Sequence, residues 1–257
     1  MERKDLFDVV IVRGADALPF LHGQLAADLM PLADGQLRWS ALLNPQGRVL
    51  FVVAALRLAA DDWRLMVPFQ RGMALAEQLQ RLVFRRKVVV SVDPTLRVIT
   101  QASGCETGIS GLRLGLTASE PGVDVVTEAA LDRFLAAGLA LVDIQASGRF
   151  LAHALRLDRF DAFGVKKGCY PGQEIVARTH FLGRNKRVLA QLDERAGAQW
   201  RSGDVLRSED AVVGEIACAG DELALAVLTQ PMAAGQRLDL GDDRAPVRVA
   251  GIDAPES

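Results

Sequence analysis

The sequence lacks the features that mark disulfide-rich, zinc-binding and membrane-spanning proteins. It contains only three cysteines, Cys105, Cys169 and Cys218, which are far apart and form no C-x-x-C pair. An odd number of widely spaced cysteines is evidence against a disulfide framework and a structural zinc site, so no metal ligands are predicted. The longest apolar run, residues 49–56, is too short to cross a bilayer, and the N-terminus MERKDLFDVV lacks the apolar core of a secretory signal. A cytoplasmic protein in a reducing compartment is therefore expected.

A surplus of charge of one sign is also lacking. The 257 residues include 30 lysines and arginines against 32 aspartates and glutamates, which gives a net charge of −2. Strong nucleic-acid binding needs many clustered cations that release counterions, so neither direct nucleic-acid binding nor membrane binding is expected. Half of the residues are hydrophobic, and this predicts an ordered globular chain with a sizeable core.

Hydrophobic periodicity and turn residues predict an α+β fold with largely antiparallel pairing in the first two thirds of the chain. Asn44-Pro45-Gln46-Gly47 separates two apolar runs and is typical of a hairpin turn. Helices are predicted over residues 16–29, 68–82 and 128–137. Strands are predicted over residues 7–13, 37–43, 48–58, 63–67, 87–92, 96–101, 112–117 and 123–127.

After residue 187 the pattern changes to short apolar stretches separated by Gly, Asp and Pro turns. Short strands are predicted over residues 188–192, 205–207, 212–217, 223–228 and 247–249. Such regular, short strands with almost no helix favour a small β-barrel. The chain is therefore divided into a first region, residues 1–183, and a C-terminal barrel, residues 184–257.

Residues 166–187, KKGCYPGQEIVARTHFLGRNKR, hold six lysines or arginines and a single acid, Glu174. This asymmetry in a nearly neutral chain indicates a surface that faces an anion. A solvated basic loop is the alternative interpretation, and the charge run alone does not distinguish the two.

Cys169 lies at the centre of these cations. Lys166 and Lys167 precede it, and nearby cations favour the thiolate form of a cysteine. Gly168 removes bulk beside the sulfur. Pro171-Gly172 either forms a turn or starts a short helix over residues 173–178, whose positive end would then lie near the sulfur. A buried structural cysteine is the alternative, but the crowd of cations and glycines is untypical of a core position.

The octapeptide Lys167-Gly168-Cys169-Tyr170-Pro171-Gly172-Gln173-Glu174, followed by Arg178, resembles the signature of the YgfZ/IBA57 family. These folate-binding proteins support iron–sulfur cluster assembly and repair and are relatives of the glycine-cleavage T-protein. Three further stretches are similar to family motifs: Phe20-Leu21-His22-Gly23-Gln24-Leu25 with Asp28, Leu43-Asn44-Pro45-Gln46-Gly47-Arg48, and Val213-Gly214-Glu215-Ile216.

The resemblance implies a T-protein-like folate-binding region with mainly antiparallel sheets and helices, plus a small C-terminal β-barrel. It implies tetrahydrofolate, mono- or polyglutamylated, as the cofactor, and iron–sulfur client or carrier proteins as partners. It also links the chain to tRNA modification. Cys169 becomes the candidate reactive thiol, and the candidate folate-binding residues are Lys167, Gly168, Tyr170, Gly172, Gln173, Glu174 and Arg178.

Within this candidate site, two assignments are open. Gln173 or Glu174 would either read the edge of the pteridine ring or brace the loop. The glutamate tail of a folate is anionic, so cations of the segment are candidates to bind it: Arg178, Arg184, Lys186 and Arg187.

The sequence departs from the family in two places. Arg156 stands where many members have an asparagine of the pocket wall. The strand after the hairpin, predicted from residue 48, carries no acid over residues 49–54, whereas T-protein-type transferases have a catalytic acid there. Aminomethyl transfer needs a group that handles protons and charge, so a conventional enzyme is less expected than a folate-dependent assembly factor.

Two alternatives remain at this point: a folate-dependent one-carbon (aminomethyl) transferase or demethylase, and an RNA-binding module. The basic segment offers only Tyr170 and Phe181 for base stacking, which disfavours the second. His22 and His153 are predicted to lie on helices in structural roles. His180 is a candidate partner for Cys169 because it is near in sequence.

Overall fold

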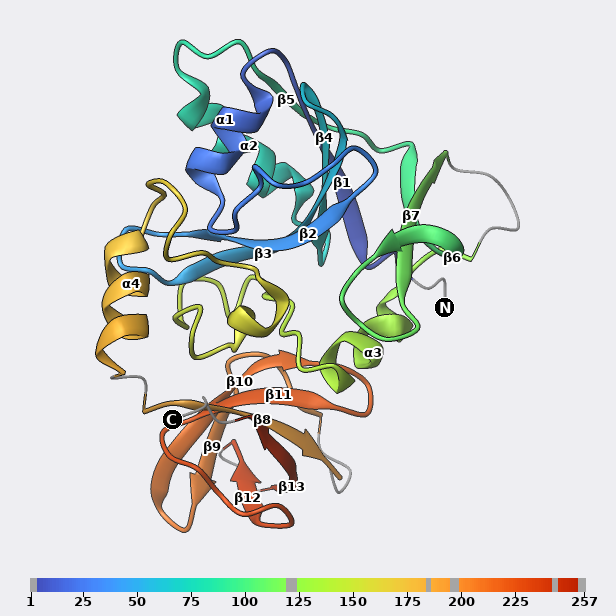
Figure 1. The fold of residues 1–257 in the computed structure, drawn as a ribbon. Helices are drawn as coiled ribbons and strands as arrows, with labels where there is room; N and C mark the ends of the chain where they lie inside the picture. Colours follow the sequence, from blue (N-terminus) through green and yellow to red (C-terminus); the bar gives the residue numbers. More distant parts are fainter. Residues whose placement is uncertain (1–3, 119–123, 184–185, 195–198, 242–244, 254–257) are drawn as a thin grey trace.

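The computed structural model describes residues 4–118, 124–183, 186–194, 199–241 and 245–253 (Figure 1). It contains a five-stranded sheet of order β2-β3-β4-β1-β5, a two-stranded sheet of β6 and β7, and a closed barrel of order β10-β11-β8-β13-β12-β9. Neighbouring strands in all three pair antiparallel. Among the described residues, no helix is long and apolar enough to span a membrane.

The five-stranded sheet is buried on both faces. Alternate residues of β3 belong to two different cores, with Val52 and Ala54 on one face and Val53 and Ala55 on the other. Burial on both faces explains why β3 is a continuous apolar run instead of an alternating pattern. The elements of this part are β1 (Phe7–Arg13), α1 (Ala17–Gln24), β2 (Leu37–Leu43), β3 (Val49–Ala59), β4 (Asp62–Pro68), α2 (Gly72–Val83) and β5 (Val89–Val92).

Two helix predictions are corrected here. The second helix begins at Gly72, because Pro68 is the last residue of β4 and pairs with Phe7 of β1. The first helix ends at Gln24 and not at residue 29. Leu25 is extended and bridges to Leu42, and the N–H of Ala26 donates to the carbonyl of Ala41, so pairing with β2 replaces the last predicted turn.

The middle of the chain is largely irregular. Its elements are β6 (Leu96–Glu106), β7 (Arg113–Ala118), the 3-10 turn Glu128–Ala130, α3 (Leu131–Ala136), the 3-10 turn Leu157–Phe160 and α4 (Gln173–Leu182). The strand predicted over residues 123–127 is wrong within its described part, where only isolated bridges from Val125 and Thr127 form. In Figure 1 the irregular stretch in yellow and lime lies between the five-stranded sheet and the barrel.

The barrel confirms the C-terminal prediction. Its strands are β8 (Val188–Asp193), β9 (Val205–Ser208), β10 (Ala211–Ala219), β11 (Ala224–Leu228), β12 (Arg237–Leu240) and β13 (Ala245–Asp253). The sequence patterns did not predict β12. Leu225 and Val227 point outward into the core shared with Phe134 of α3, so the barrel packs directly against the first region. The boundary between residues 183 and 184 stays a prediction, because Arg184 and Asn185 lie outside the described residues.

Candidate functional site

Lys167 anchors the segment 166–187 at its N-terminal end. The side chain is buried, and its ammonium donates to the carbonyls of His22, Leu25 (2.6 Å) and Ala27 (3.1 Å) at the end of α1. The last carbonyls of a helix have no partner within the helix, and a cation satisfies them well. Burial lowers the pKa of Lys167 to about 8. The structure thus uses Lys167 to hold two sequence motifs together.

Tyr170 provides a second anchor three residues later. The residue is only 7 % exposed and belongs to the main core, and the ammonium of Lys167 lies 4.8 Å from the ring centroid. A cation over an aromatic face is attractive, more so away from water. Burial raises the pKa of Tyr170 to about 12. Its hydroxyl has no hydrogen-bond partner in the described structure, which is unusual for a buried phenol.

Gly172 places the segment on the Asn44–Gly47 hairpin turn. Its φ is +78°, and a Cβ there would lie 2.6 Å from the carbonyl oxygen of Asn44 and 2.7 Å from the Cα of Gly47. Only glycine fits such a close approach with a positive φ. The side chain of Asn44 keeps the hairpin in shape by accepting the N–H groups of Gln46 and Arg48. Two motifs that are more than a hundred residues apart therefore meet backbone to backbone.

Cys169 lies between these anchors and is exposed to solvent, as is Gly168. A Cβ on Gly168 would lie 3.9 Å from Nε2 of His22, so His22 is adjacent to this loop. Burial and the charge of Lys167 lower the pKa of His22, which favours the neutral imidazole. Gln173 braces the loop by donating from its amide to the carbonyl of Lys167 at 3.0 Å. The bracing role that the sequence left open for Gln173 is thus present in the structure.

Most of the charged side chains in the described rest of the segment are exposed. Glu174 and Arg178 lie on the open face of α4, with side chains 85 % and 64 % exposed and a loose ion pair of 3.9 Å between them. Phe181 is also exposed, and so are Lys186 and Arg187 beyond the helix. Arg184 lies outside the described residues. In Figure 1, α4 stands at the left edge of the molecule beside the irregular stretch.

His153 and His180 form a small aromatic cluster that the sequence did not indicate. Their ring centroids are 6.1 Å apart, and His153 also lies 4.6 Å from Phe163. Burial lowers the pKa of His153 to about 4, and its Nε2 has no hydrogen-bond partner in the described structure. His153 occupies a turn, so its predicted helical position is wrong, whereas His22 does lie on α1.

The fourth motif joins the same assembly through the barrel. Glu215 of β10 accepts two hydrogen bonds from the guanidinium of Arg149, one of them at 2.9 Å. The carbonyl of Arg149 in turn accepts from Arg48 at the end of the hairpin turn. Three of the motifs that carry the family resemblance therefore touch directly, and Arg149 links the fourth motif to the hairpin turn. No sequence signal identified Arg149 as the link.

β3 offers no acid near this assembly. Residues 49–54 are apolar and mostly buried, and the ring of Phe51 lies 4.1 Å from the guanidinium carbon of Arg71. Arg71 itself donates to the carbonyls of Leu50, Val142 and Asp143. Arg71, which stacks on an apolar strand and binds carbonyls, therefore has a structural role. β3 itself has no carboxylate for proton handling.

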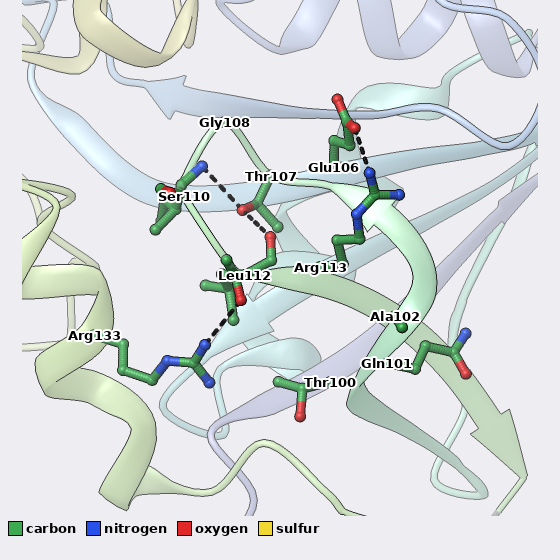
Figure 2. Close-up of a pocket in the computed structure, with 12 residues that line it drawn as sticks. Thr100, Gln101, Ala102, Glu106, Thr107, Gly108, Ser110, Leu112, Arg113 and Arg133 are labelled. Atoms are coloured by element: carbon green, nitrogen blue, oxygen red, sulfur yellow. Dashed lines mark hydrogen bonds and ion pairs between the residues drawn. The ribbon is translucent and has the colours of Figure 1, made fainter.

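A cavity of about 750 Å³ lies elsewhere, at the connection between β6 and β7 (Figure 2). Its lining includes Arg133 of α3, which donates to the carbonyl of Gly111 at 3.1 Å, and Arg113, which pairs with Glu106 at 2.6 Å. None of the residues predicted to bind folate lines it.

No family model matches the sequence. The tRNA-modifying protein YgfZ of Shigella boydii is 26% identical over 273 aligned residues, covering 82% of this chain and 82% of that protein, and YgfZ of Escherichia coli O157:H7 gives the same figures. An uncharacterized protein of Haemophilus influenzae is 27% identical, covering 71% of this chain and 69% of its own.

Among solved structures, aminomethyltransferase T of the glycine cleavage system from Bartonella henselae matches 97% of this chain and 86% of its own, with a TM-score of 0.59 and 16% identity. This chain is similar to YgfZ proteins and has a T-protein-like fold. The predicted α+β fold with a C-terminal barrel is confirmed. The roles of Cys169 and of the seven predicted folate-binding residues stay predictions.

Proposed function

We propose that this YgfZ-like protein binds a reduced folate in its first region and supports the assembly or repair of iron–sulfur clusters in client proteins, with Cys169 as its reactive thiol. The observation that carries this proposal is the exposed Cys169 between two buried anchors, Lys167 and Tyr170. Burying an ammonium and a phenol costs free energy. A fold that accepts this cost on both sides of an exposed thiol holds that thiol in a fixed place.

The chemistry of a lone thiol limits what Cys169 does. Thiolates are natural ligands of iron and of iron–sulfur clusters. Among the described residues, no group of three or more histidine, cysteine, aspartate or glutamate side chains is arranged to hold a metal. In this proposal, Cys169 therefore contacts a cluster, a persulfide or a client cysteine only while a partner supplies the remaining ligands.

Folate binding is supported by the T-protein-like fold and by the YgfZ relatives. Lys167, Tyr170, Gly172 and Gln173 are engaged in holding the loop, so their contribution to a folate site is to shape its wall. Glu174 and Arg178 are exposed and remain available for the ligand, with Arg178 suited to the anionic glutamate tail of a polyglutamylated folate. The pteridine ring needs a partly apolar pocket with a few polar groups.

Transferase or demethylase chemistry is the less supported candidate. The structural likeness to an aminomethyltransferase favours it, but a TM-score of 0.59 at 16% identity concerns the fold alone. The buried, apolar β3 provides no acid for proton handling. A folate-dependent assembly factor requires no such acid.

Replacement of Cys169 by alanine tests the proposal. The relatives named tRNA-modifying protein YgfZ make an iron–sulfur enzyme that modifies tRNA the first client to assay. In a strain that lacks its own YgfZ-like protein, Cys169→Ala is expected to lose most of the client activity that the wild type restores. The variant should keep tetrahydrofolate binding and its melting temperature, because the side chain is exposed.

Cys105→Ala is the matched control. Cys105 is also a free cysteine, but it is half-buried, its thiol donates to the carbonyl of Gly35 at 3.0 Å, and burial raises its pKa. This variant should restore client activity in full. Full activity of Cys169→Ala, with the same amount of folded protein, would contradict the thiol role.

A further inference from the structure

The connection between α2 and β5 exposes an unusual set of side chains. We call it the α2–β5 tip and define it by seven exposed residues: Arg81, Leu82, Phe84, Arg85, Arg86, Lys87 and Val89. Phe84 is 87 % exposed, Val89 68 % and Leu82 38 %. In Figure 1 this connection is the teal-green loop at the top, at the end of the molecule remote from the barrel.

Phe84 occupies a backbone conformation that few side chains adopt. It follows the last residue of α2 with φ of 49° and ψ of −113°. Helices commonly end on a glycine at such a position, because other residues are strained at positive φ. The ring gains no packing in return, since it is almost fully exposed. Strain and exposure together indicate that the ring acts on something outside the fold.

The cations of the tip are not neutralised within the protein. In the part of the chain that the structure describes, Arg81, Arg85, Arg86 and Lys87 form no ion pair, and the guanidinium of Arg85 lies 5.4 Å from the Phe84 ring. Residues 78–92 contain no acid. The carboxylate of Asp16 accepts the backbone N–H of Lys87 and so orders the loop. The tip is a positive patch in a chain whose net charge is −2.

We propose that the α2–β5 tip docks the protein reversibly on an anionic lipid surface. The four cations would lie at the phosphate level and the Phe84 ring, with Val89 and Leu82, at the boundary of the acyl chains. Basic residues beside exposed apolar side chains are the composition of interfacial membrane anchors. This inference goes beyond the proposed function and differs from the expectation from the sequence that no membrane is a partner.

The exposed aliphatic side chains favour lipid over RNA. A base stacks on an aromatic ring, and the tip has a single one, whereas Val89 and Leu82 have no use in stacking. Both are readily taken up at the headgroup boundary. A long polyanion such as RNA would also extend past the tip over the rest of a chain that has more acids than bases, which would repel it. A bilayer need touch only the tip.

Vesicle co-sedimentation with the full-length protein tests the proposal. At low salt, we expect the wild type to bind vesicles of phosphatidylcholine with phosphatidylglycerol and not vesicles of phosphatidylcholine alone. Arg85→Gln with Arg86→Gln should weaken this binding by about 30-fold, since each cation near such a surface contributes about fivefold. The control removes the same charge from two exposed positions of the barrel region that form no ion pair with the described residues, Arg201→Gln with Arg237→Gln, and should bind as the wild type does.

Phe84→Gly separates docking from folding. Glycine relieves the positive φ, so the free energy of unfolding should stay the same or rise, while vesicle binding falls by about tenfold. Three outcomes would overturn the proposal. The first is no binding of the wild type to the anionic vesicles, and the second is equal binding by the arginine and control variants. The third is vesicle binding that transfer RNA displaces fully and that Phe84→Gly does not weaken.

Discussion

Segment 166–187 has a first half, residues 166–173, and a second half, residues 174–187. The two halves are similar in charge and differ in structure. Both are rich in cations, yet the ammonium of Lys167 is buried on three carbonyls, whereas Arg178 on α4 is mostly in water. The first half is fixed to α1 and to the hairpin turn. The second half touches the core mainly through Val176. Among the described residues, this run of charge thus contains a buried structural cation, Lys167, and exposed ones, and the exposed fraction of the side chain distinguishes them.

The two halves are therefore expected to have different roles. The first half sets the position of Cys169, so changes there should act on stability and through stability on function. The second half carries charge in solvent, so changes there should act on ligand binding and leave stability almost unchanged. Substitutions in the first half should therefore lower stability far more than substitutions in the second half.

Gly172→Ala should be the most damaging change. The added Cβ would lie 2.6 Å from the carbonyl oxygen of Asn44, and the residue would keep a φ of +78°. Backbone cannot yield as a flexible side chain does, so we expect a loss of about 3 kcal/mol in the free energy of unfolding by urea denaturation.

Gly183→Ala is its control at the other end of α4. Gly183 also has a positive φ, +58°, but a Cβ there meets nothing within 4 Å. Only the backbone strain remains, which costs about 1 kcal/mol. Equal losses for the two variants would mean that the contact between Gly172 and the hairpin turn contributes nothing to stability.

His153, which packs on His180 of α4, should make the free energy of unfolding depend on pH. Burial lowers its pKa from 6.5 to about 4. Between these values the unfolded chain binds a proton that the folded chain does not, so stability is full above pH 6.5 and falls as the pH drops toward 4. At pH 5 the loss relative to pH 7 should be about 2 kcal/mol.

His153→Phe removes the titrating group and keeps an aromatic ring beside Phe163. The free energy of unfolding of the wild type minus that of the variant, measured by urea denaturation at a series of pH values, should fall by that same amount from pH 7 to pH 5. A difference that is constant with pH would show that His153 is protonated as easily in the folded chain as in the unfolded one.

Glu174→Gln should have the smallest effect on stability. Its ion pair with Arg178 is long, at 3.9 Å, and both side chains are mostly exposed. Such pairs on a helix surface contribute less than about 0.5 kcal/mol. A melting temperature close to that of the wild type is therefore expected, and a large drop would move Glu174 into the group of anchoring residues.

Much of the fold could be predicted from the sequence because local patterns carry it. The hairpin turn, the alternation of strands and turns, and the short barrel strands are each encoded in neighbouring residues. The failures come from long-range contacts: pairing of Leu25 with Leu42 shortens α1, and Pro68 is held in β4 by Phe7. Periodicity cannot detect a partner strand.

The motif around Cys169 is visible in the sequence, but the contacts that hold it are not. Cys169 is exposed, and its role as a reactive thiol stays a prediction. That Lys167 serves α1, that Arg149 joins the barrel to the hairpin, and that His22 lies beside Gly168 depend on residues distant in the sequence. Only the folded chain brings them together.

Calorimetric titration with tetrahydrofolate, as the monoglutamate and as a polyglutamate at low and high salt, tests the central claim most directly. We expect both forms to bind and the polyglutamate to bind more tightly. If Arg178 binds the anionic tail as proposed, this advantage should shrink at high salt and in Arg178→Gln. Absence of heat and of binding for both forms, with protein that melts cooperatively, would contradict the folate-binding account.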